Sequence, residues 1–432
     1  MNYYSLNKQA PNTNFKDAVI KGLAPDKGLY FPSEIKPLPA TFFEQIGQLS
    51  PVEIAFEAIK QFVLPDIPEP TLKAIVEDTL NFDFPVVPLN EQISTLELFH
   101  GPTMAFKDVG ARFMARCLGY FNENNNEDVT VLVATSGDTG GAVANGFLGV
   151  KGVNVVILYP SGKVSAIQEK QLTTLGKNIT ALEVDGVFDD CQDMVKKAFL
   201  DTSITDHMQL TSANSINVAR WLPQMFYFMF AYKQLQRKYE DIVFSIPSGN
   251  FGNICAGMMA QQLGLPIKHF IAANNANNVV TEYLQTKHYI PKSSIQTISN
   301  AMDVGNPSNF IRIQEIYQHN FELLQNNLSS FSFSDNETKA AMTEIYEQYH
   351  YIADPHGAIG YLGCKAYAEK HPDAHCVFLE TAHPTKFLDV VEETIHTAME
   401  LPDQIKAVMD KNKVSKKISN YEDLKTFLLA MT

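Results

Sequence analysis

Three mostly apolar runs, each followed at once by a short polar loop, constrain the fold of this chain more than any other feature. They span residues 129–134, 242–246 and 376–380. Runs of five or six such residues between turn signals are typical of strands buried on both faces of a parallel sheet, which helices must then cover. The sequence therefore predicts an α/β fold, and the polar loops follow the carboxyl ends of strands, where open α/β sheets bind ligands.

The loop after the second run, Gly249-Asn250-Phe251-Gly252-Asn253, suggests a binding site for a phosphate group. Glycines allow the backbone to approach a ligand closely, and successive amides at a helix start favour an anion. No Lys-Ser or Lys-Thr pair follows the second glycine, so a Walker nucleotide loop is disfavoured. A glycine turn that only connects strand to helix is the alternative, and this loop alone does not decide between them.

The loops after the other two runs carry hydroxyl groups. Ser136 and Thr139 lie in a small-residue loop at another helix start, which suits the carboxylate of a substrate. An ordinary capped helix would explain the same residues. Thr381 is a single hydroxyl directly after the third strand.

Lys107 lies in the stretch His100-Gly101-Pro102-Thr103-Met104-Ala105-Phe106-Lys107-Asp108, just after a turn signal and at the expected start of a helix over residues 107–120. A free lysine amine has a pKa of about 10.4 and becomes a nucleophile at neutral pH only when burial or a nearby cation lowers that value. The flanking apolar residues predict such burial. Asp108 and Asp138 are possible carboxylate partners, although most lysines at helix starts are solvated or paired.

Composition limits the partners and the location of the chain. Its 432 residues, 45% of them hydrophobic, suffice for two or more cores. The net charge of −14 argues against nucleic acid or an anionic membrane as a partner. The start of the chain lacks the pattern of a secretory signal, and the apolar segment at 221–232 is too short to span a bilayer. We expect that segment to be a buried helix. We also expect the protein to be cytoplasmic and to be either a monomer or a homodimer.

The cysteines and histidines favour structural roles over a metal site. Five scattered cysteines in mostly apolar settings are typical of reduced, buried thiols. His371, His375 and Cys376 lack a second ligand pair with the spacing of a zinc site. We expect no metal.

The order of the expected elements predicts two doubly wound α/β lobes with a cleft between them, preceded by an N-terminal cap domain. Residues 1–90 contain helical segments at 51–62 and 70–81 between proline-rich turns. Strands and helices alternate over residues 91–220 and again over residues 221–432. The asparagine-rich loops at 122–126 and 274–278 are candidates for segments that are mobile or cover the site.

Five sequence blocks in this order resemble the threonine synthases of the bacterial and fungal branch. The blocks lie at residues 22–32, 99–110, 135–142, 247–253 and 380–386, so the resemblance covers nearly the whole chain. These enzymes use pyridoxal phosphate and share fold type II, that of the tryptophan synthase β-subunit. The resemblance thus implies conversion of O-phospho-L-homoserine and water to L-threonine and phosphate, the last step of threonine biosynthesis.

The resemblance also implies roles for individual residues. Lys107 would form the Schiff base with the cofactor, and Thr381 would face its pyridine nitrogen. The residues implied for the cofactor phosphate are those of the glycine loop, Gly249, Asn250, Phe251, Gly252 and Asn253. Related plant and actinobacterial enzymes have asparagine where this chain has Asp138, so no role is carried over to that carboxylate.

The phosphate of the substrate needs a cation of its own. Lys163, in a loop after an expected strand, is the first candidate, and Arg112, Arg220 and Lys386 are others. For each of them the alternative is that the side chain is a solvated basic group on the surface.

Two other functions share some of these features. A phospholyase or a serine/threonine dehydratase would use the same lysine and glycine loop but release a keto acid. A non-catalytic regulator that binds the cofactor would not need the lysine.

Overall fold

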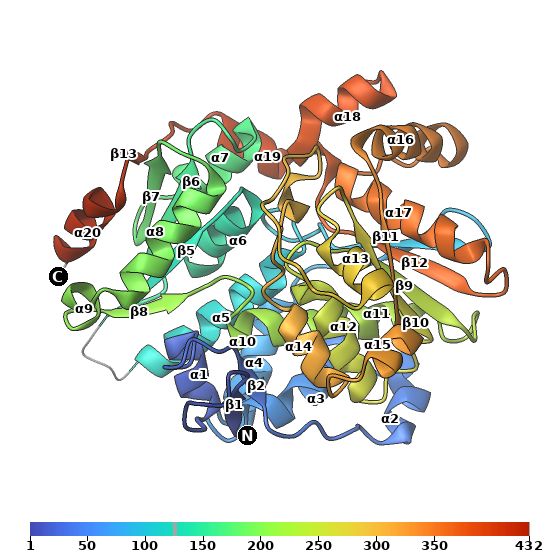
Figure 1. Ribbon diagram of the computed structural model, residues 1–432, viewed down its shortest axis with the longest axis horizontal. Helices are drawn as coiled ribbons and strands as arrows, with labels where there is room; N and C mark the ends of the chain where they lie inside the picture. The colour runs from blue at the N-terminus through green and yellow to red at the C-terminus, as the bar shows by residue number, and fades with distance from the viewer. Residues whose placement is uncertain (124–127, 432) are drawn as a thin grey trace.

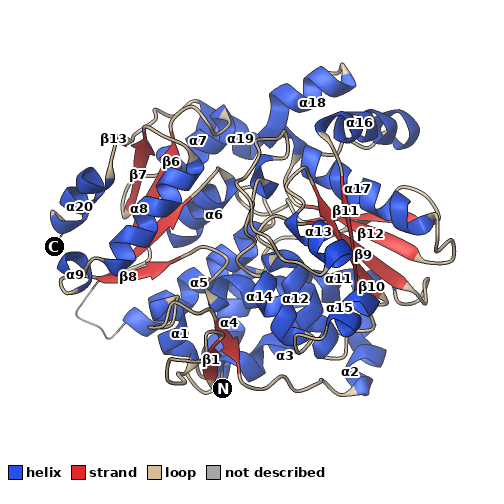
Figure 2. Ribbon diagram, viewed as in Figure 1, coloured by secondary structure: helices blue, strands red, loops and turns tan. Residues whose placement is uncertain are grey.

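The structure, a computed structural model, describes residues 1–123 and 128–431. Most of the asparagine-rich loop at 122–126 therefore lies outside the described residues. Two lobes flank a central region, and the N-terminal segment lies along one side of both (Figures 1 and 2). This arrangement confirms the predicted α/β class.

The first lobe is built on a parallel sheet with the strand order β13-β7-β6-β5-β8. Its side chains alternate between two apolar layers, as expected for strands buried on both faces. Val131 and Val133 pack into the core shared with α5 and α6, whereas Leu132 and Ala134 pack into the core that includes residues of α8 and α20. The strands are β5 (Val129–Ala134), β6 (Val153–Pro160), β7 (Ile179–Val184), β8 (Gln209–Ser212) and β13 (Lys416–Ile418). The helices are α5 (Lys107–Asn122), α6 (Asp138–Phe147), α7 (Ala166–Thr173), α8 (Phe188–Leu200), α9 (Thr202–Thr205), α19 (Asp403–Met409) and α20 (Tyr421–Leu429).

The second lobe contains a sheet with the order β11-β10-β9-β12-β4-β3, in which only β3 runs antiparallel to its neighbour among the described strands. Phe228 of α11 packs edge-on against Phe244 and Phe270 of this sheet, while α17 contacts β9 and β12. The strands are β3 (Val86–Pro88), β4 (Ile93–Glu97), β9 (Ile242–Pro247), β10 (His269–Asn274), β11 (Leu328–Ser332) and β12 (His375–Glu380). The helices are α11 (Met225–Leu235), α12 (Gly252–Gln262), α13 (Val279–Thr286), η3 (Asn300–Met302), α14 (Phe310–Ile316), α15 (Phe321–Asn327), α16 (Asp335–Tyr349), α17 (Pro355–Ala368), η4 (Pro384–Phe387) and α18 (Leu388–Ile395).

The N-terminal segment forms a helical layer against both lobes, shown in blue in Figure 1. Its two predicted helices are present as α3 and α4, with Ser50 and Glu53 forming a capping box at the start of α3. α3 contacts α11 of the second lobe, and α4 contacts α5 of the first. The elements of this segment are β1 (Tyr3–Ser5), β2 (Tyr30–Pro32), α1 (Phe15–Lys21), α2 (Ala40–Gln45), η1 (Ile46–Gln48), α3 (Pro51–Val63) and α4 (Glu69–Thr79).

The predicted division at residues 90 and 220 does not follow the sheets. Strands β3 and β4 precede the first lobe in sequence but pair in the second lobe, where β4 lies beside β12. The C-terminal strand β13 returns to pair with β7 of the first lobe. Each lobe is therefore built from separate stretches of chain, because strand pairing joins residues that no local pattern connects.

The structure confirms two expectations from composition, the buried apolar segment and the buried thiols. The segment at 221–232 is buried and divides at Pro223 into the end of α10 (Val218–Trp221), η2 (Leu222–Gln224) and α11. All five cysteines are free and buried. Within residues 1–123 and 128–431 no helix is long and apolar enough to cross a membrane, and the same residues contain no group of three candidate metal ligands.

Arg312 of α14 joins the N-terminal layer to both lobes. The side chain is fully buried. Its Nη2 donates to the backbone oxygens of Tyr30 at 3.0 Å and Ile216 at 2.6 Å, and its Nη1 donates to the backbone oxygen of Ser215 at 3.1 Å. The guanidinium carbon also lies 4.3 Å from the ring centroid of Trp221. One cation thus satisfies three backbone carbonyls from two separate parts of the chain.

We predict that Arg312→Met lowers the free energy of unfolding by about 3 kcal/mol or more, because it leaves several buried carbonyls without a donor. Urea denaturation followed by circular dichroism measures this change. Lys8→Met is the matched control, because Lys8 forms an exposed ion pair with Glu315 of the same helix at 3.5 Å and should contribute less than about 1 kcal/mol. Equal midpoints for Arg312→Met and the parent would contradict the assigned role.

Candidate active site

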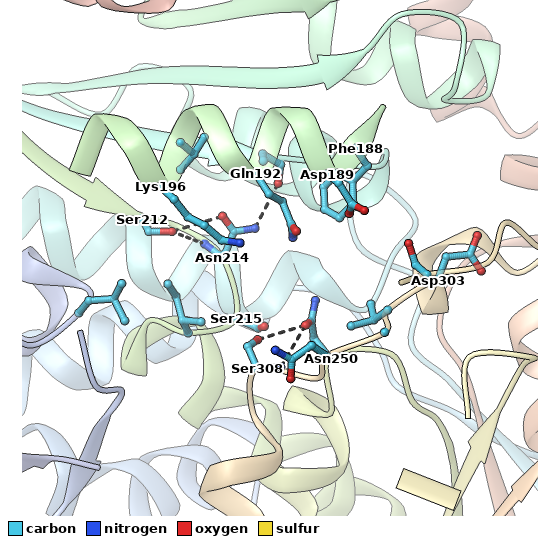
Figure 3. Close-up of a pocket in the computed structure, with 18 of the residues that line it drawn as sticks. Phe188, Asp189, Gln192, Lys196, Ser212, Asn214, Ser215, Asn250, Asp303 and Ser308 are labelled. Atoms are coloured by element: carbon cyan, nitrogen blue, oxygen red, sulfur yellow. Dashed lines mark hydrogen bonds between the residues drawn. The ribbon is translucent and has the colours of Figure 1, made fainter. Parts of the chain in front are cut away.

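A small inner pocket lies where the loops after β5, β9 and β12 meet, and a larger outer cleft continues from it. The inner pocket has a volume of about 100 Å³, and the outer cleft has about 620 Å³. Asn250, Asp303 and Ser215 line both spaces. Figure 3 shows the outer cleft, with Lys196 and Gln192 of α8 on one side and Asn250 and Ser308 on the other. The three predicted loops therefore do line one cavity.

Lys107 lies in the inner pocket at the first position of α5. The turn before it is held by Asp108, whose carboxylate accepts hydrogen bonds from the backbone nitrogen of Thr103 at 2.9 Å and from its hydroxyl at 2.5 Å. Gly101 is required in this turn because a Cβ atom there would lie 2.5 Å from the Asp108 carboxylate. Asp108 thus shapes the turn and is not the partner of the lysine.

A backbone hydrogen bond connects the lysine turn to the end of β12. The Phe106 nitrogen donates to the carbonyl oxygen of Thr381 at 2.8 Å, and Ala105 and Ala382 form an antiparallel bridge. Thr381 is buried and lines the inner pocket. The lysine and the threonine, which are far apart in sequence, are therefore fixed beside one another by the backbone.

The surroundings of Lys107 lower the pKa of its amine. Part of the side chain faces the pocket, but protein encloses the amine, and this burial lowers the pKa of Lys107 below its ordinary value. The carboxylate of Asp138 opposes the change, whereas the cations of Lys386 and Arg220 add to it. The side chain as a whole is half-buried, so it is less enclosed than the flanking apolar residues predict.

The loop after β5 places Ser136 and Thr139 on the inner pocket. Its shape depends on Thr135, whose hydroxyl accepts hydrogen bonds from the backbone nitrogens of Gly137 at 2.9 Å and Gly140 at 2.8 Å. Gly137 has a φ of 137°, a conformation that favours glycine. Thr135 was not singled out from the sequence, because its contribution is an internal hydrogen bond of the loop.

The residues of the glycine loop after β9 also line the inner pocket. Phe251 has a φ of 60°, and this left-handed residue turns the chain into α12. A Cβ atom on Gly249 would lie 2.8 Å from the carbonyl oxygen of Ala301, so only glycine fits against the η3 turn without displacement. The first amides of α12 have no backbone acceptor within the helix, and among them the nitrogen of Ile254 donates to the side chain of Asn253 at 2.9 Å. This geometry provides a cradle for an anion.

Two asparagines of the glycine loop hold its shape. Asn253 donates from its side chain to the carbonyl oxygen of Pro247 at 2.8 Å, and Asn250 accepts from the hydroxyl of Ser308 at 3.1 Å. The second asparagine-rich loop supports the wall beside this cradle. Asn275 donates to Asp303 at 2.9 Å and is itself buried, so this loop is packed behind the site and does not cover it.

The structure separates the four candidate cations for a substrate phosphate. Lys163 is exposed and does not line either space, because its loop turns towards solvent after β6. Arg112 points away from the pocket and donates to the carbonyl oxygen of Asp78. Lys386 is buried in an ion pair with Asp138. Arg220 is the candidate that lines the inner pocket.

Several pocket residues were not predicted from the sequence. Asn214, Ser215, Gln224, Asn300 and His356 line the inner pocket and come from segments with no distinctive motif. The Asp-Pro-His-Gly stretch that contains His356 indicates a helix start, but the position of the histidine at the cavity depends on the packing of α17 against the second sheet.

His356 belongs to a chain of buried polar groups behind the pocket. Its Nδ1 lies 2.5 Å from a carboxylate oxygen of Asp354, and its Nε2 accepts from the backbone nitrogen of Ala301 at 3.2 Å. The Asp354 nitrogen donates to Glu380 at 2.6 Å. Burial and the neighbouring Asp354 raise the pKa of Glu380 well above its ordinary value. These groups fix the η3 turn against the glycine loop.

Three side-chain atoms lining the pocket are buried and have no hydrogen-bond partner among the described residues. They are Nε of Arg220, Oε1 of Gln224 and Oδ1 of Asn300. Buried polar atoms without partners are uncommon, and at a pocket wall a bound water, ion or ligand can supply the missing partner. An aldehyde-reactive amine at Lys107 and an anion cradle at 249–253 complete a donor set that fits pyridoxal phosphate.

Comparison with known proteins agrees with this geometry. A family model described as pyridoxal-phosphate dependent enzyme matches residues 90–381. Models described as threonine synthase N terminus and threonine synthase, C-terminal match residues 2–80 and 357–428.

Among individual proteins, the chain is 40% identical to a threonine synthase of Haemophilus influenzae over 99% of this chain and 100% of the relative. It is also 40% identical to the enzyme of Escherichia coli over 94% of each chain. The crystal structure of an Escherichia coli threonine synthase superposes with a TM-score of 0.94 at 38% identity, covering 100% of both chains. A pyridoxal phosphate-bound threonine synthase from Brucella melitensis gives a TM-score of 0.92 at 33% identity, over 99% of this chain and 98% of the other.

The pocket, its lysine and these full-length matches lead to one conclusion: the chain belongs to the threonine synthase family of pyridoxal phosphate-dependent enzymes.

Proposed function

We propose that this chain is a pyridoxal phosphate-dependent lyase that converts O-phospho-L-homoserine and water to L-threonine and phosphate, the last step of threonine biosynthesis. The observation that carries the proposal is the position of Lys107, half-buried at the meeting point of a hydroxyl loop and a glycine cradle. The threonine synthase relatives span the whole chain, which supports the specific reaction.

Lys107 has two tasks in this proposal. Its amine would hold the aldehyde carbon of the cofactor. As a free amine it would take a proton from Cα of the substrate and return protons to neighbouring carbons, and its lowered pKa increases the fraction that is neutral and able to accept a proton. The bound cofactor supplies an electron sink for these proton transfers.

The remaining pocket residues bind and orient. We assign the cofactor phosphate to the backbone of residues 249–253 and the pyridine nitrogen to the hydroxyl of Thr381, both of which line the pocket. Ser136, Thr139 and the first amides of α6 are assigned to the carboxylate of the substrate, because a helix start with hydroxyl groups favours an anion.

Arg220 is our candidate for the phosphate of the substrate. Its side chain is buried, and burial lowers its pKa to about 10, which leaves it charged at neutral pH. One nitrogen donates to the carbonyl oxygen of Ala213, but the guanidinium has no carboxylate partner in an ion pair within the described part of the chain. A buried cation facing a pocket without a paired acid favours binding of an anion.

Two broader expectations concern the location and the assembly of the protein. Five buried free thiols are typical of a cytoplasmic protein. A monomer or a homodimer remains our expectation for the state of assembly.

The reaction products separate the proposed function from its alternatives. Protein loaded with pyridoxal phosphate should convert O-phospho-L-homoserine to equal amounts of L-threonine and inorganic phosphate, and Lys107→Ala should form neither. Release of phosphate with a keto acid would instead identify a phospholyase or dehydratase. Absence of both products from protein with bound cofactor would favour a regulator.

We further predict that Arg220→Met raises KM for O-phospho-L-homoserine or lowers kcat/KM by about 10- to 100-fold, the cost of one charge-assisted anion contact. The absorption of the bound cofactor should stay unchanged. Arg116→Met is the matched control, because Arg116 pairs with Asp78 outside the pocket and should leave KM as it is. An Arg220→Met enzyme with normal kcat/KM would contradict the assignment.

A further inference from the structure

A buried ion pair joins the loops around the active-site lysine. Nζ of Lys386 is 2.7 Å from Oδ1 of Asp138, and the side chains are 0% and 5% exposed. The same Nζ donates to the carbonyl oxygen of Thr103 at 2.9 Å, and the carboxylate of Asp138 also accepts from the side-chain amide of Gln168 at 3.0 Å. Among the described lysines, this is the one whose ion pair is buried on both sides.

The pair joins the three segments that carry functional groups. Thr103 lies in the turn that delivers Lys107, and Asp138 lies between Ser136 and Thr139 in the carboxylate loop. Lys386 lies in η4, shortly after Thr381. A change in the pair would therefore reach all three segments.

Stability alone does not account for such a pair. Removing two charges from water costs free energy that their attraction often only balances, and apolar residues of similar volume are commonly as stable. A buried lysine and aspartate beside a reactive amine need another explanation, and the charges that surround Lys107 supply it.

The charged groups that face Lys107 come from three elements: Asp138 of α6, Lys386 of η4 and Arg220 of α10. An unpaired Asp138 would favour a protonated Lys107, which is the wrong state for a nucleophile. Burial alone would raise the pKa of Asp138, but Lys386 and then Lys107 outweigh this effect and hold it far below its ordinary range. The carboxylate therefore stays ionised, and a cation beside it must balance its field at Lys107.

We propose that Asp138 and Lys386 are a paired positioning device for Lys107: Asp138 fixes the carboxylate loop to Gln168 and η4, and Lys386 cancels the charge that this fixation introduces. Lys107 then faces a neutral pair instead of a free carboxylate. The proposal rests on the role proposed for Lys107 in holding the cofactor, and it assigns both partners to positioning, since neither lines the inner pocket.

A double-mutant cycle tests the compensation. The readout is the pH titration of the absorption band that arises from the covalent link between Lys107 and pyridoxal phosphate. Lys386→Met should raise the pKa of this band by about 1 unit, because it leaves Asp138 unopposed, and Asp138→Asn should lower it by a similar amount. The double variant should return the pKa close to that of the parent.

A second readout uses protein without cofactor. The pH dependence of acetylation of the Lys107 amine, followed by peptide mass spectrometry, should shift in the same directions. Lys386→Gln serves if Lys386→Met does not fold, because glutamine retains hydrogen bonding but carries no charge.

Lys413→Met is the matched control. Lys413 forms ion pairs with Glu169 at 2.6 Å and with Glu183 at 2.8 Å. None of these three residues is among the charged groups that shift the pKa of Lys107. This variant should lose stability and keep the pKa of the band.

Two results would overturn the proposal: single variants whose band titrates like that of the parent, or a double variant in which the shifts fail to cancel. Either result would leave the covalent band itself intact. Absence of the band from parent protein would instead contradict the role proposed for Lys107.

Discussion

Burial of the Lys107 amine is the constraint on which the rest of the site depends. A lysine is seldom placed where protein encloses its amine, because the charged form loses its hydration there. Here the same effect lowers the pKa and favours the reactive form of the amine. The surrounding structure must then hold the lysine firmly without giving it a free carboxylate partner. Asp108 is occupied by Thr103, and Asp138 is occupied by Lys386.

The two sheets make this placement possible. Strands β5, β9 and β12 end at the same cavity, so each loop contributes one kind of group: hydroxyls after β5, glycines after β9 and a threonine after β12. The backbone link from Phe106 to Thr381 fixes the lysine turn to the second sheet, although the helix that follows Lys107 packs in the first lobe. Arg312 donates a hydrogen bond to the backbone oxygen of Ser215, a residue that lines the same cavity. The site is thus rigidly built at the junction of both lobes.

Local patterns were sufficient to predict the three strands that precede the polar loops, the loops themselves and the helix that begins at Lys107, because each depends on neighbouring residues. The hydroxyl loop and glycine loop were placed together by a general property of parallel sheets. Contacts across the fold were beyond such patterns. No local signal connects Lys386 with Asp138, or His356 with Ala301, and nothing in the sequence distinguishes exposed Lys163 from buried Arg220. The assignment of β4 and β13 to lobes also depended on pairing between distant segments.

The most direct test of this account is to identify the lysine that holds the cofactor. Protein loaded with pyridoxal phosphate is reduced with borohydride, digested and mapped by mass spectrometry. The account predicts that the phosphopyridoxyl group lies on the peptide containing Lys107 and that this modification accounts for the loss of the cofactor absorption band. A stoichiometric label on another lysine, such as Lys386 or Lys163, with Lys107 unmodified, would contradict it.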